Sequence, residues 1–256
     1  MDRKKFLIVV AAGSGTRMGG ILPKQFLKLD GKTVLQRSIE AFTRAVPGIR
    51  VVTVLAPEMR DYWKTCCYDA RFYCPQALVD GGLTRFHSIQ NALGRIPEDA
   101  LVAVHDGVRP LVSAKLIQRL FDAARTHEGV IPCLPVSDTL RVLSPLSDTA
   151  DAATPAVNFG EGTFLRYDDA APALVSRDRL FSVQTPQIFD AKLLRAAYAL
   201  PYETSFTDDG SVVEKYLGQH PGQAARVVYV PGEKANIKLT TPEDLTMAEA
   251  ILSLQQ

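Results

Sequence analysis

Short apolar runs alternate with amphipathic stretches through the first half of the chain. Residues 6–10 form an unbroken apolar run with β-branched side chains, which is typical of a strand buried on both faces. Residues 33–42 place apolar side chains at helical spacing. The same alternation predicts further strands at 49–55, 77–80, 101–105 and 129–136, and further helices at 59–66, 85–93 and 114–127. These repeated units predict an α/β fold, with a Rossmann-like, mostly parallel twisted sheet and helices on both faces.

Residues 137–185 break this rhythm. Within them, residues 144–173 are rich in Ala, Asp, Pro, Thr and Gly and show no helical period. We expect an excursion from the sheet, an extended β-arm of two strands with a flexible tip. Regular structure returns at 191–199 and 209–216, followed by a strand at 225–230 and a last helix capped by Thr241. We therefore interpret residues 1–256 as a single domain with residues 137–185 as an inserted arm.

The first predicted strand runs into a loop of small residues. These are Ala11, Ala12, Gly13, Ser14 and Gly15. Their minimal side chains let a ligand approach the backbone N–H groups closely. Two cations follow, Arg17 and Lys24, and strand, bare amides and cations together favour a polyphosphate site. The alternative is a simple tight turn, and the pattern matches neither the P-loop nor the dinucleotide fingerprint.

Composition excludes several classes of protein. The chain has 256 residues, of which 46% are hydrophobic and 22% charged, as in an ordinary globular domain with a full core. The net charge of +1 argues against nucleic-acid binding by bulk electrostatics but allows a local basic pocket. Apolar runs are too short for a membrane span or a secretion signal, and the four cysteines have no Cys-x-x-Cys spacing. We expect a cytoplasmic protein with free thiols and neither a nucleic-acid nor a membrane partner.

Polar clusters recur where the predicted strands end. Besides the first loop they are Gly81-Gly82 with Ser88, Asp106 with Arg109, residues 137–139 and residues 236–238. In a doubly wound sheet, ligands bind outside the carboxyl ends of the strands, so we expect these clusters to meet in one crevice.

Asp106 follows a short apolar strand and His105. A carboxylate at a strand tip that faces a phosphate loop is an oxygen ligand of the kind Mg²⁺ prefers. The alternative is a carboxylate that caps the next turn or pairs with Arg109. We interpret His105 as structural.

The chain shows no catalytic triad, no paired general acids and no Cys/His metal spacing. Cations, amides and one carboxylate suit direct in-line attack of a substrate oxygen on a nucleotide phosphorus. That reaction depends on positioning and charge stabilisation.

Several motifs together resemble a known enzyme family. They are residues 11–18 with Pro23-Lys24-Gln25, Gly81-Gly82 with Arg85 and Ser88, and residues 105–110, 184–187, 207–209 and 236–238. In this order, from about residue 6 to residue 250, they resemble the 2-C-methyl-D-erythritol 4-phosphate cytidylyltransferase family of the non-mevalonate isoprenoid pathway. The resemblance implies CTP and a polyol phosphate as substrates, Mg²⁺ as cofactor and pyrophosphate as the leaving product.

The resemblance also implies roles for individual residues. Residues 11–15 would bind the CTP phosphates and ribose, with Gly82 and Ser88 near the cytosine. Arg17 and Lys24 would stabilise the α-phosphorus, where charge develops. Asp106 would bind Mg²⁺.

A second group of residues is implied for the acceptor. The residues predicted to meet its phosphate are Asp106, Arg109, Thr139, Thr185 and Thr207, with Arg177 and Lys238 as catalytic residues. In this family the arm of one subunit reaches over its partner's site. We therefore expect a homodimer formed through residues 137–185, with Arg177 and Thr185 acting across the interface.

Two departures from the family pattern leave alternatives open. Leu83 stands where relatives often have an acidic residue, so a contact to the base or ribose is lost or replaced. The stretch between Thr139 and Arg177 is longer than the usual arm, so Arg166 and Arg179 are alternatives to Arg177.

The motifs also leave two other functions open. A ribitol 5-phosphate or other polyol phosphate cytidylyltransferase would share nearly all of them. An inactive nucleotide-sensing module is the alternative from a different class. Retention of Arg17, Lys24, Asp106 and Lys238 argues against the sensor, which needs no cation at the α-phosphorus.

Overall fold

The computed structural model describes residues 3–13, 22–141, 143–145, 165–167, 177–222 and 225–254. Ser14, Gly15 and Arg17, for which roles were predicted, lie outside the described residues. Arg166 lies in a described strand, but only its backbone is described. The chain divides into two compact units, Met1–Leu134 with Val183–Gln256, and Pro135–Ser182.

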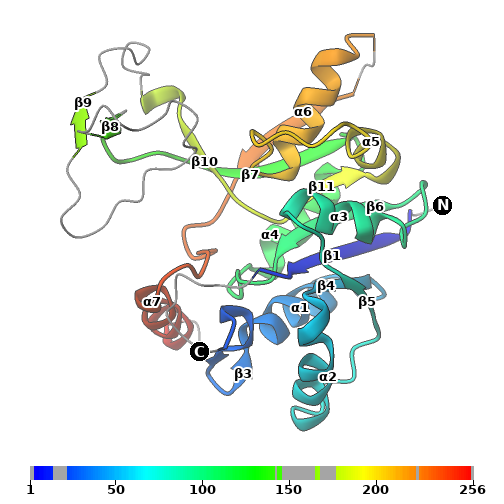
Figure 1. Ribbon diagram of the computed structural model, residues 1–256, viewed down its shortest axis with the longest axis vertical. Helices are drawn as coiled ribbons and strands as arrows, with labels where there is room; N and C mark the ends of the chain where they lie inside the picture. Colours follow the sequence, from blue (N-terminus) through cyan, green and yellow to red (C-terminus); the bar gives the residue numbers. More distant parts are fainter. Residues whose placement is uncertain are drawn as a thin grey trace. The chain divides into compact units, whose positions relative to one another are not determined.

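The first unit is built on a mostly parallel sheet (Figure 1). Its strands are β1 (Lys5–Ala11), β4 (Arg50–Leu55), β5 (Gln76–Asp80), β6 (Leu101–Asp106), β7 (Gly129–Pro135), β11 (Gln187–Asp190) and β12 (Val227–Pro231). They lie in the order β7-β11-β6-β1-β4-β5, and β12 also pairs with β7. Pairing is parallel throughout, except that β11 runs antiparallel to both β6 and β7. The predicted α/β sheet is confirmed.

Short polar side chains cap the beginnings of several helices. The helices are α1 (Val34–Ala45), α2 (Arg60–Asp69), α3 (Arg85–Leu93), α4 (Ala114–Ala123), α5 (Ala191–Ala197), α6 (Asp209–Gln219) and α7 (Pro242–Ser253). Thr33, Thr84 and Ser113 each accept a hydrogen bond from a backbone N–H in the first turn of the helix that follows. α7 begins at Pro242 as predicted, and Asp244 accepts a hydrogen bond from the Thr241 amide at 2.8 Å.

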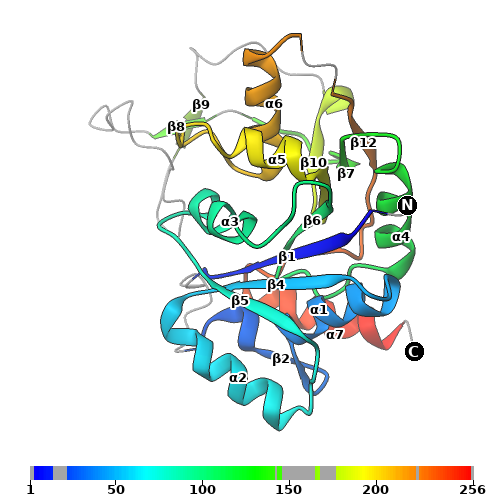
Figure 2. The same cartoon turned by 90° about the vertical axis from the view of Figure 1, so that its right-hand side faces the viewer.

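Alternation along β1 divides the core into two layers. Leu7 and Val9 are buried against α1, α2 and α4, whereas Phe6 and Ile8 are buried against α3, α5 and α6. Figure 2 shows the helices on the two faces of the sheet. Each fully buried aliphatic side chain of this kind stabilises the fold by roughly 1.5–3 kcal/mol. Helices on both faces were predicted and are confirmed.

The parallel register aligns the carboxyl ends of the central strands. Val10 pairs with Asp106 on β6 and with Val54 on β4, and Leu55 pairs with Asp80 on β5. The chain leaves these strands at one edge of the sheet. The Gly107 amide donates to the Val10 carbonyl at 2.9 Å, so the exits of β1 and β6 are fastened together.

Short elements connect these strands and helices. They are the hairpin β2 (Lys28–Leu29) and β3 (Lys32–Thr33), and the 3₁₀ turns η2 (Lys24–Phe26) and η3 (Pro57–Met59). α7 packs on this hairpin through a small cluster that includes Leu29, Leu239 and Ala248. No helix in the described part of the chain is long and apolar enough to cross a bilayer.

The described residues of the second unit, Pro135–Ser182, include two short paired strands and a 3₁₀ turn. β8 (Leu143–Pro145) pairs antiparallel with β9 (Leu165–Tyr167), and η4 covers Arg177–Arg179. The strand β10 (Phe181–Val183) begins in this unit and ends at Val183, where the first unit resumes. The described residues of this unit thus include one antiparallel strand pair, and the tip of the predicted arm lies outside the described residues. The arm itself stays a prediction. Its role in dimerisation stays a prediction.

Candidate active site

Two adjoining cavities lie at the carboxyl end of the sheet in the first unit. The larger, about 580 Å³, is lined by residues 11–13 and by Lys24, Gly82 and Ser88. The smaller, about 210 Å³, is lined by Arg109, Thr185, Thr207 and Asp208. Arg85, Asp106 and Lys238 line both cavities. The predicted convergence of the strand exits is therefore present for these residues.

Hydrogen bonds from side chains shape the loop after β1. The Gln25 side chain is buried, and its Nε2 donates to the carbonyls of Ala11, at 2.8 Å, and Gly13, at 3.0 Å. With those carbonyls occupied, the described start of the loop has a defined course into the larger cavity. Gln25 belongs to the motif described above, but no role was predicted for it.

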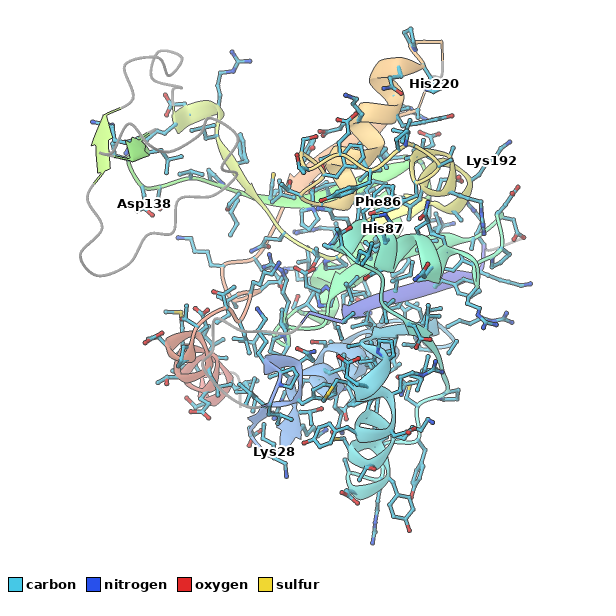
Figure 3. The ribbon with its side chains drawn as sticks, viewed as in Figure 1. Lys28, Phe86, His87, Asp138, Lys192 and His220 are labelled. Atoms are coloured by element: carbon cyan, nitrogen blue, oxygen red, sulfur yellow. The ribbon has the colours of Figure 1, made fainter. Side chains whose placement is uncertain are left out.

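The Gly81-Gly82 loop approaches its neighbours too closely for any side chain. A Cβ at Gly81 would lie 2.4 Å from the Ala12 Cβ, and one at Gly82 would lie 2.5 Å from the Cβ of His87 on α3 (Figure 3). The buried Ser88 hydroxyl accepts from the Gly82 amide at 3.0 Å and donates to the Thr84 carbonyl at 2.9 Å. Ser88 thus holds this loop in shape, and its predicted contact with cytosine stays a prediction.

Asp106 is the centre of a cluster of cations. Its Oδ2 lies 2.9 Å from Lys238 Nζ and 3.5 Å from Arg109 Nε, and its Oδ1 lies 3.7 Å from Arg85 Nε. Burial alone would raise the pKa of this carboxyl, but the Arg85 guanidinium and the Lys238 ammonium outweigh burial and hold the pKa well below its usual value. Asp106 is therefore ionised at every physiological pH.

Arg109 is buried beside Asp106, and its side chain is held by a hydrogen bond to a backbone carbonyl. Its Nη1 donates to the Asn236 carbonyl at 2.8 Å, while its buried Nε has no hydrogen-bond partner within the described structure. Burial lowers the pKa of Arg109, although Asp106 acts in the opposite direction. Asn236 in turn donates from Nδ2 to the Thr185 carbonyl at 2.8 Å. The loops at 184–187 and 236–238 are thereby fixed around one guanidinium.

Thr185 lies beside Asp106 of its own chain, in the first unit. Its Oγ1 accepts a hydrogen bond from the Asp106 amide at 3.1 Å. The expectation that Thr185 acts across a dimer interface stays a prediction. Its predicted contact with the acceptor phosphate stays a prediction.

His105 completes a buried chain of hydrogen bonds. Burial lowers the pKa of His105 to about 4, so the ring is neutral at pH 7. Because the Arg109 carbonyl can only accept, Nε2 carries the proton and donates to it at 3.1 Å. Nδ1 then accepts from the Thr185 hydroxyl at 3.2 Å. The interpretation of His105 as a structural residue agrees with these contacts.

Arg85 and Asp209 were not assigned functions from the sequence, yet both belong to this cluster. Arg85 Nη2 donates to Asp209 Oδ2 at 2.7 Å. Burial would lower the pKa of Arg85, but Asp209 and Asp106 raise it above its ordinary value. The two residues stand far apart in the chain, so no local pattern signals their pairing.

Two of the predicted site residues belong to the second unit. These are Thr139 and Arg177, and Arg177 Nη1 donates to the Ser137 carbonyl at 3.3 Å. Their roles at the site stay predictions. Leu83, at the mouth of the larger cavity, exposes 96% of its surface.

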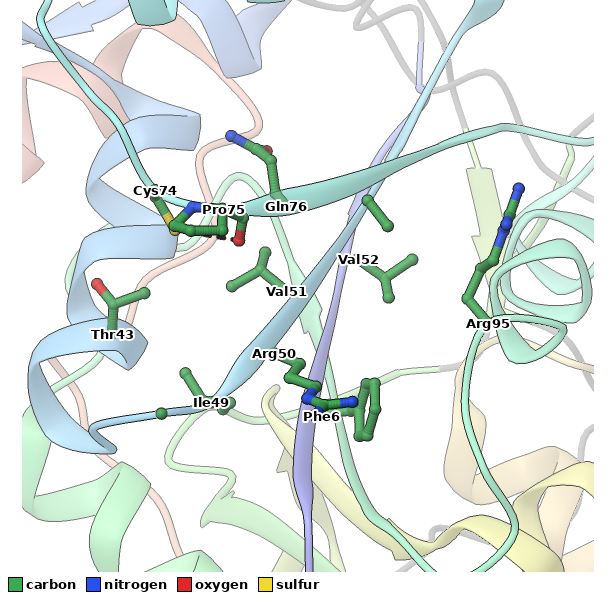
Figure 4. Close-up of a pocket in the computed structure, with 12 residues that line it drawn as sticks. Phe6, Thr43, Ile49, Arg50, Val51, Val52, Cys74, Pro75, Gln76 and Arg95 are labelled. Carbon is green, nitrogen blue, oxygen red and sulfur yellow. Dashed lines mark hydrogen bonds between the residues drawn. The ribbon is translucent and has the colours of Figure 1, made fainter.

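A third hollow, about 760 Å³, lies at the opposite edge of the sheet (Figure 4). It surrounds the starts of β4 and β5 and is lined by Ile49, Val51, Pro75 and Arg95, among others. Among the described residues that line it there is no Asp or Glu. Since ligands of open α/β sheets bind at the carboxyl ends of strands, we assign the functional site to the two cavities around Asp106.

Comparison with known proteins agrees with this geometry. A family model described as 2-C-methyl-D-erythritol 4-phosphate cytidylyltransferase matches residues 6–154 and 141–254. The protein of that name from Bacteroides thetaiotaomicron is 39% identical over 249 residues, which cover 97% of this chain and 100% of that protein. The one from Porphyromonas gingivalis is 40% identical over 253 residues, covering 99% and 100%. The crystal structure of 4-diphosphocytidyl-2C-methyl-D-erythritol synthase from Anaerococcus prevotii matches with a TM-score of 0.71 at 28% identity, covering 98% of this chain and 96% of that one.

The sheet, the amide loop and the cation cluster at its carboxyl end define a nucleotidyltransferase. The chain belongs to the 2-C-methyl-D-erythritol 4-phosphate cytidylyltransferase family, as the motifs had indicated.

Proposed function

We propose that this protein transfers the cytidylyl group of CTP to 2-C-methyl-D-erythritol 4-phosphate and releases pyrophosphate. The observation that carries the proposal is the pair of cavities that share Asp106, Lys238 and Arg85. The larger cavity, bordered by the amide loop, has the size of a small-molecule site and suits the nucleotide. The smaller one has Arg109, Lys238 and the Thr207 residue along its wall and suits the phosphate of a smaller acceptor.

The reaction needs no nucleophile from the protein. An oxygen of the acceptor phosphate attacks the α-phosphorus of CTP, and a new phosphorus–oxygen bond forms. The bond from the α-phosphorus to the bridging oxygen breaks, and its electron pair leaves with pyrophosphate. The protein's task is to align the two phosphates and to stabilise charge on the α-phosphoryl oxygens.

Cations from three parts of the chain serve this task. Lys24, with Arg17, would stabilise the charge that develops at the α-phosphate. Lys238 and Arg109 neutralise the acceptor phosphate, which would otherwise be repelled by the triphosphate. Lys238 suits this role because its side chain remains 44% exposed while its ammonium stands 2.9 Å from Asp106.

The residues around Asp106 fit a divalent cation held jointly with the nucleotide. No group of three or more metal-ligating side chains occurs among the described residues, so the protein alone does not build a cage. Mg²⁺ commonly binds through one or two carboxylates together with substrate phosphates, and Asp106 supplies such a carboxylate. When bound, Mg²⁺ would neutralise phosphate charge.

Further parts of the proposal concern assembly. We expect a homodimer in which the second unit brings Arg177 and Thr139 to the acceptor phosphate. A cytoplasmic location, which supplies CTP and keeps the thiols reduced, completes the proposal.

The proposal is tested by measuring pyrophosphate release over a panel of nucleoside triphosphates and polyol phosphates, with and without Mg²⁺. Release is expected when CTP, 2-C-methyl-D-erythritol 4-phosphate and Mg²⁺ are all present. Faster turnover with ribitol 5-phosphate than with 2-C-methyl-D-erythritol 4-phosphate would show that the proposed acceptor is wrong. CTP binding without turnover on any acceptor would favour a sensor.

A further inference from the structure

Arg85 differs from the other two cations around Asp106 because it has a buried carboxylate of its own. It is the first residue of α3, and its Nη2 donates to Asp209 Oδ2 at 2.7 Å. Asp209, the first residue of α6, has no exposed surface. The ion pairs described for Lys238 and Arg109, by contrast, are both made with Asp106. The charge of Arg85 is therefore balanced before any substrate arrives.

Asp209 is itself held at both oxygens. While Oδ2 accepts from Arg85, Oδ1 accepts from the Tyr198 hydroxyl at 2.7 Å. The Tyr198 ring stacks on Phe86, the residue after Arg85, with 4.7 Å between ring centroids. A buried carboxylate with both oxygens occupied has a fixed place, because moving it would leave an unpaired charge in the interior.

The distance from Arg85 to Asp106 is the informative one. Arg85 Nε stands 3.7 Å from Asp106 Oδ1, which is longer than a hydrogen bond, whereas Lys238 Nζ reaches Oδ2 at 2.9 Å. The guanidinium thus attracts the carboxylate without occupying Oδ1. Since Asp106 lines both cavities, Oδ1 keeps acceptor capacity where the two substrates would meet.

We propose that Arg85 is a positioning residue for the transfer reaction and that Asp209 sets its position. Asp209 keeps the guanidinium beyond hydrogen-bond distance of Asp106, so that Asp106 Oδ1 stays available to the metal–nucleotide complex. The attraction between Arg85 and Asp106 nevertheless keeps the carboxylate in its orientation. Without Asp209, Arg85 closes on Asp106 and competes for that oxygen. This inference rests on the proposed role of Asp106 in the cytidylyltransferase site.

A double-mutant cycle tests the proposal. Asp209→Asn keeps the shape and one acceptor oxygen for Arg85, and its NH₂ group can donate to the Tyr198 oxygen, but it removes the charge that restrains Arg85. We expect the calorimetric Kd for CTP in Mg²⁺ to rise about tenfold, as for other residues that orient a metal ligand, and kcat to fall with it. In an Asp106→Asn background the same substitution should change the Kd less than twofold. An equal loss in both backgrounds would mean that the pair acts through the fold alone, and it would overturn the proposal.

Two further variants keep the test independent of stability. Arg85→Lys retains the charge, but its side chain cannot reach both carboxylates. Its effect on the Kd for CTP should therefore depend on Asp106 in the same way as that of Asp209→Asn. Its melting temperature should stay close to that of wild type. Arg60→Lys is the matched control, because Arg60 makes a 2.8 Å ion pair with Asp80 on the exposed surface. It should leave the Kd unchanged; a loss there as large as in Arg85→Lys would also overturn the proposal.

The two proposals fail in different ways. If wild-type protein binds CTP with Mg²⁺ but releases no pyrophosphate with 2-C-methyl-D-erythritol 4-phosphate, the proposed function fails while the binding cycle still tests Arg85. If pyrophosphate is released and the cycle is additive, the function stands and the positioning role is lost.

Discussion

The two ends of the sheet differ in what surrounds their cavities. At the amino ends of the strands, a hollow of about 760 Å³ is lined mainly by apolar side chains and by arginines such as Arg95. At the carboxyl ends, a cavity of about 580 Å³ and one of about 210 Å³ share a buried carboxylate and two cations. Volume alone would select the first end. Charge, hydrogen bonding and strand direction select the second.

The difference follows from the common direction of the parallel strands. A parallel strand delivers its next residues to the same edge as its neighbours, so the exits of β1, β5 and β6 combine their loops in one place. The amino ends receive chain segments that mainly close the core. The comparison predicts that substitutions at the two ends have effects of very different size.

The largest effect is expected from Lys24. Lys24→Ala should reduce kcat/KM by about a hundredfold to a thousandfold, or about 2.7–4 kcal/mol, by analogy with removal of one donor that stabilises transition-state charge. Steady-state pyrophosphate release measures it. Turnover at the wild-type rate in this variant would contradict a catalytic role for Lys24, which is the main chemical difference proposed between the two ends of the sheet.

A smaller effect concerns the pH dependence of stability through His105. Its folded pKa of about 4 lies below the ordinary 6.5, because burial favours the neutral ring. The unfolded chain therefore binds more protons between these values, and the contribution of His105 is complete above about 6.5 and is lost as the pH falls toward 4. From pH 7 to pH 5, wild type should lose about 2 kcal/mol of unfolding free energy more than His105→Gln does.

Urea unfolding at the two pH values measures this difference. Gln retains a donor for the Arg109 carbonyl, so the variant is expected to fold. The same substitution at His220, which is exposed, is the control and should behave as wild type. Parallel pH dependence in His105→Gln and wild type would contradict a neutral buried ring.

Gly82→Ala should weaken CTP binding about tenfold, because the new Cβ would meet the His87 Cβ at 2.5 Å and its backbone carbon at 3.0 Å. The loop must then move away from α3. KM for CTP should change more than kcat. Gly218→Ala is the matched control, since nothing lies within 4 Å of its Cβ position on α6. It should not weaken binding, and comparable KM values for the two variants would exclude the steric explanation.

The smallest effect is expected at the amino end. Arg95→Ala should leave kcat/KM within about twofold and stability within about 0.5 kcal/mol, as for an exposed surface residue. The same assay and melts measure it. A loss comparable to that of Lys24→Ala would show that the hollow at this end takes part in the reaction.

Sequence patterns predicted the elements whose periods are long or strongly apolar. Helix α1 and strand β6 appear at the predicted places within a few residues. β11 was missed, because a strand of four residues, Gln187–Asp190, is too short to show an alternation. The predicted arm ended at residue 185, and no element was predicted between it and the helix at 191–199.

The candidate site was predicted by residue type but not by partner. Asp106 and Lys238 were named from strand exits, and they stand 2.9 Å apart. The partners of Ser88 and Thr185 were not foreseen, since a hydroxyl that fastens a loop and one that meets a ligand have the same sequence signature. Arg85 and Asp209 are 124 residues apart, so only the folded chain brings them together.

The antiparallel strand β11 has a consequence for how the protein is made. β11 fills the space between β6 and β7, yet both of those strands leave the ribosome long before residues 187–190 do. Until then β6 has a backbone edge with no partner on that side, at the middle of the future sheet. A nascent chain that stops short of Gln187 is therefore a chain with exposed, apolar strand edges, prone to join another copy. Completion of the centre of the sheet waits for the whole second unit to be synthesised.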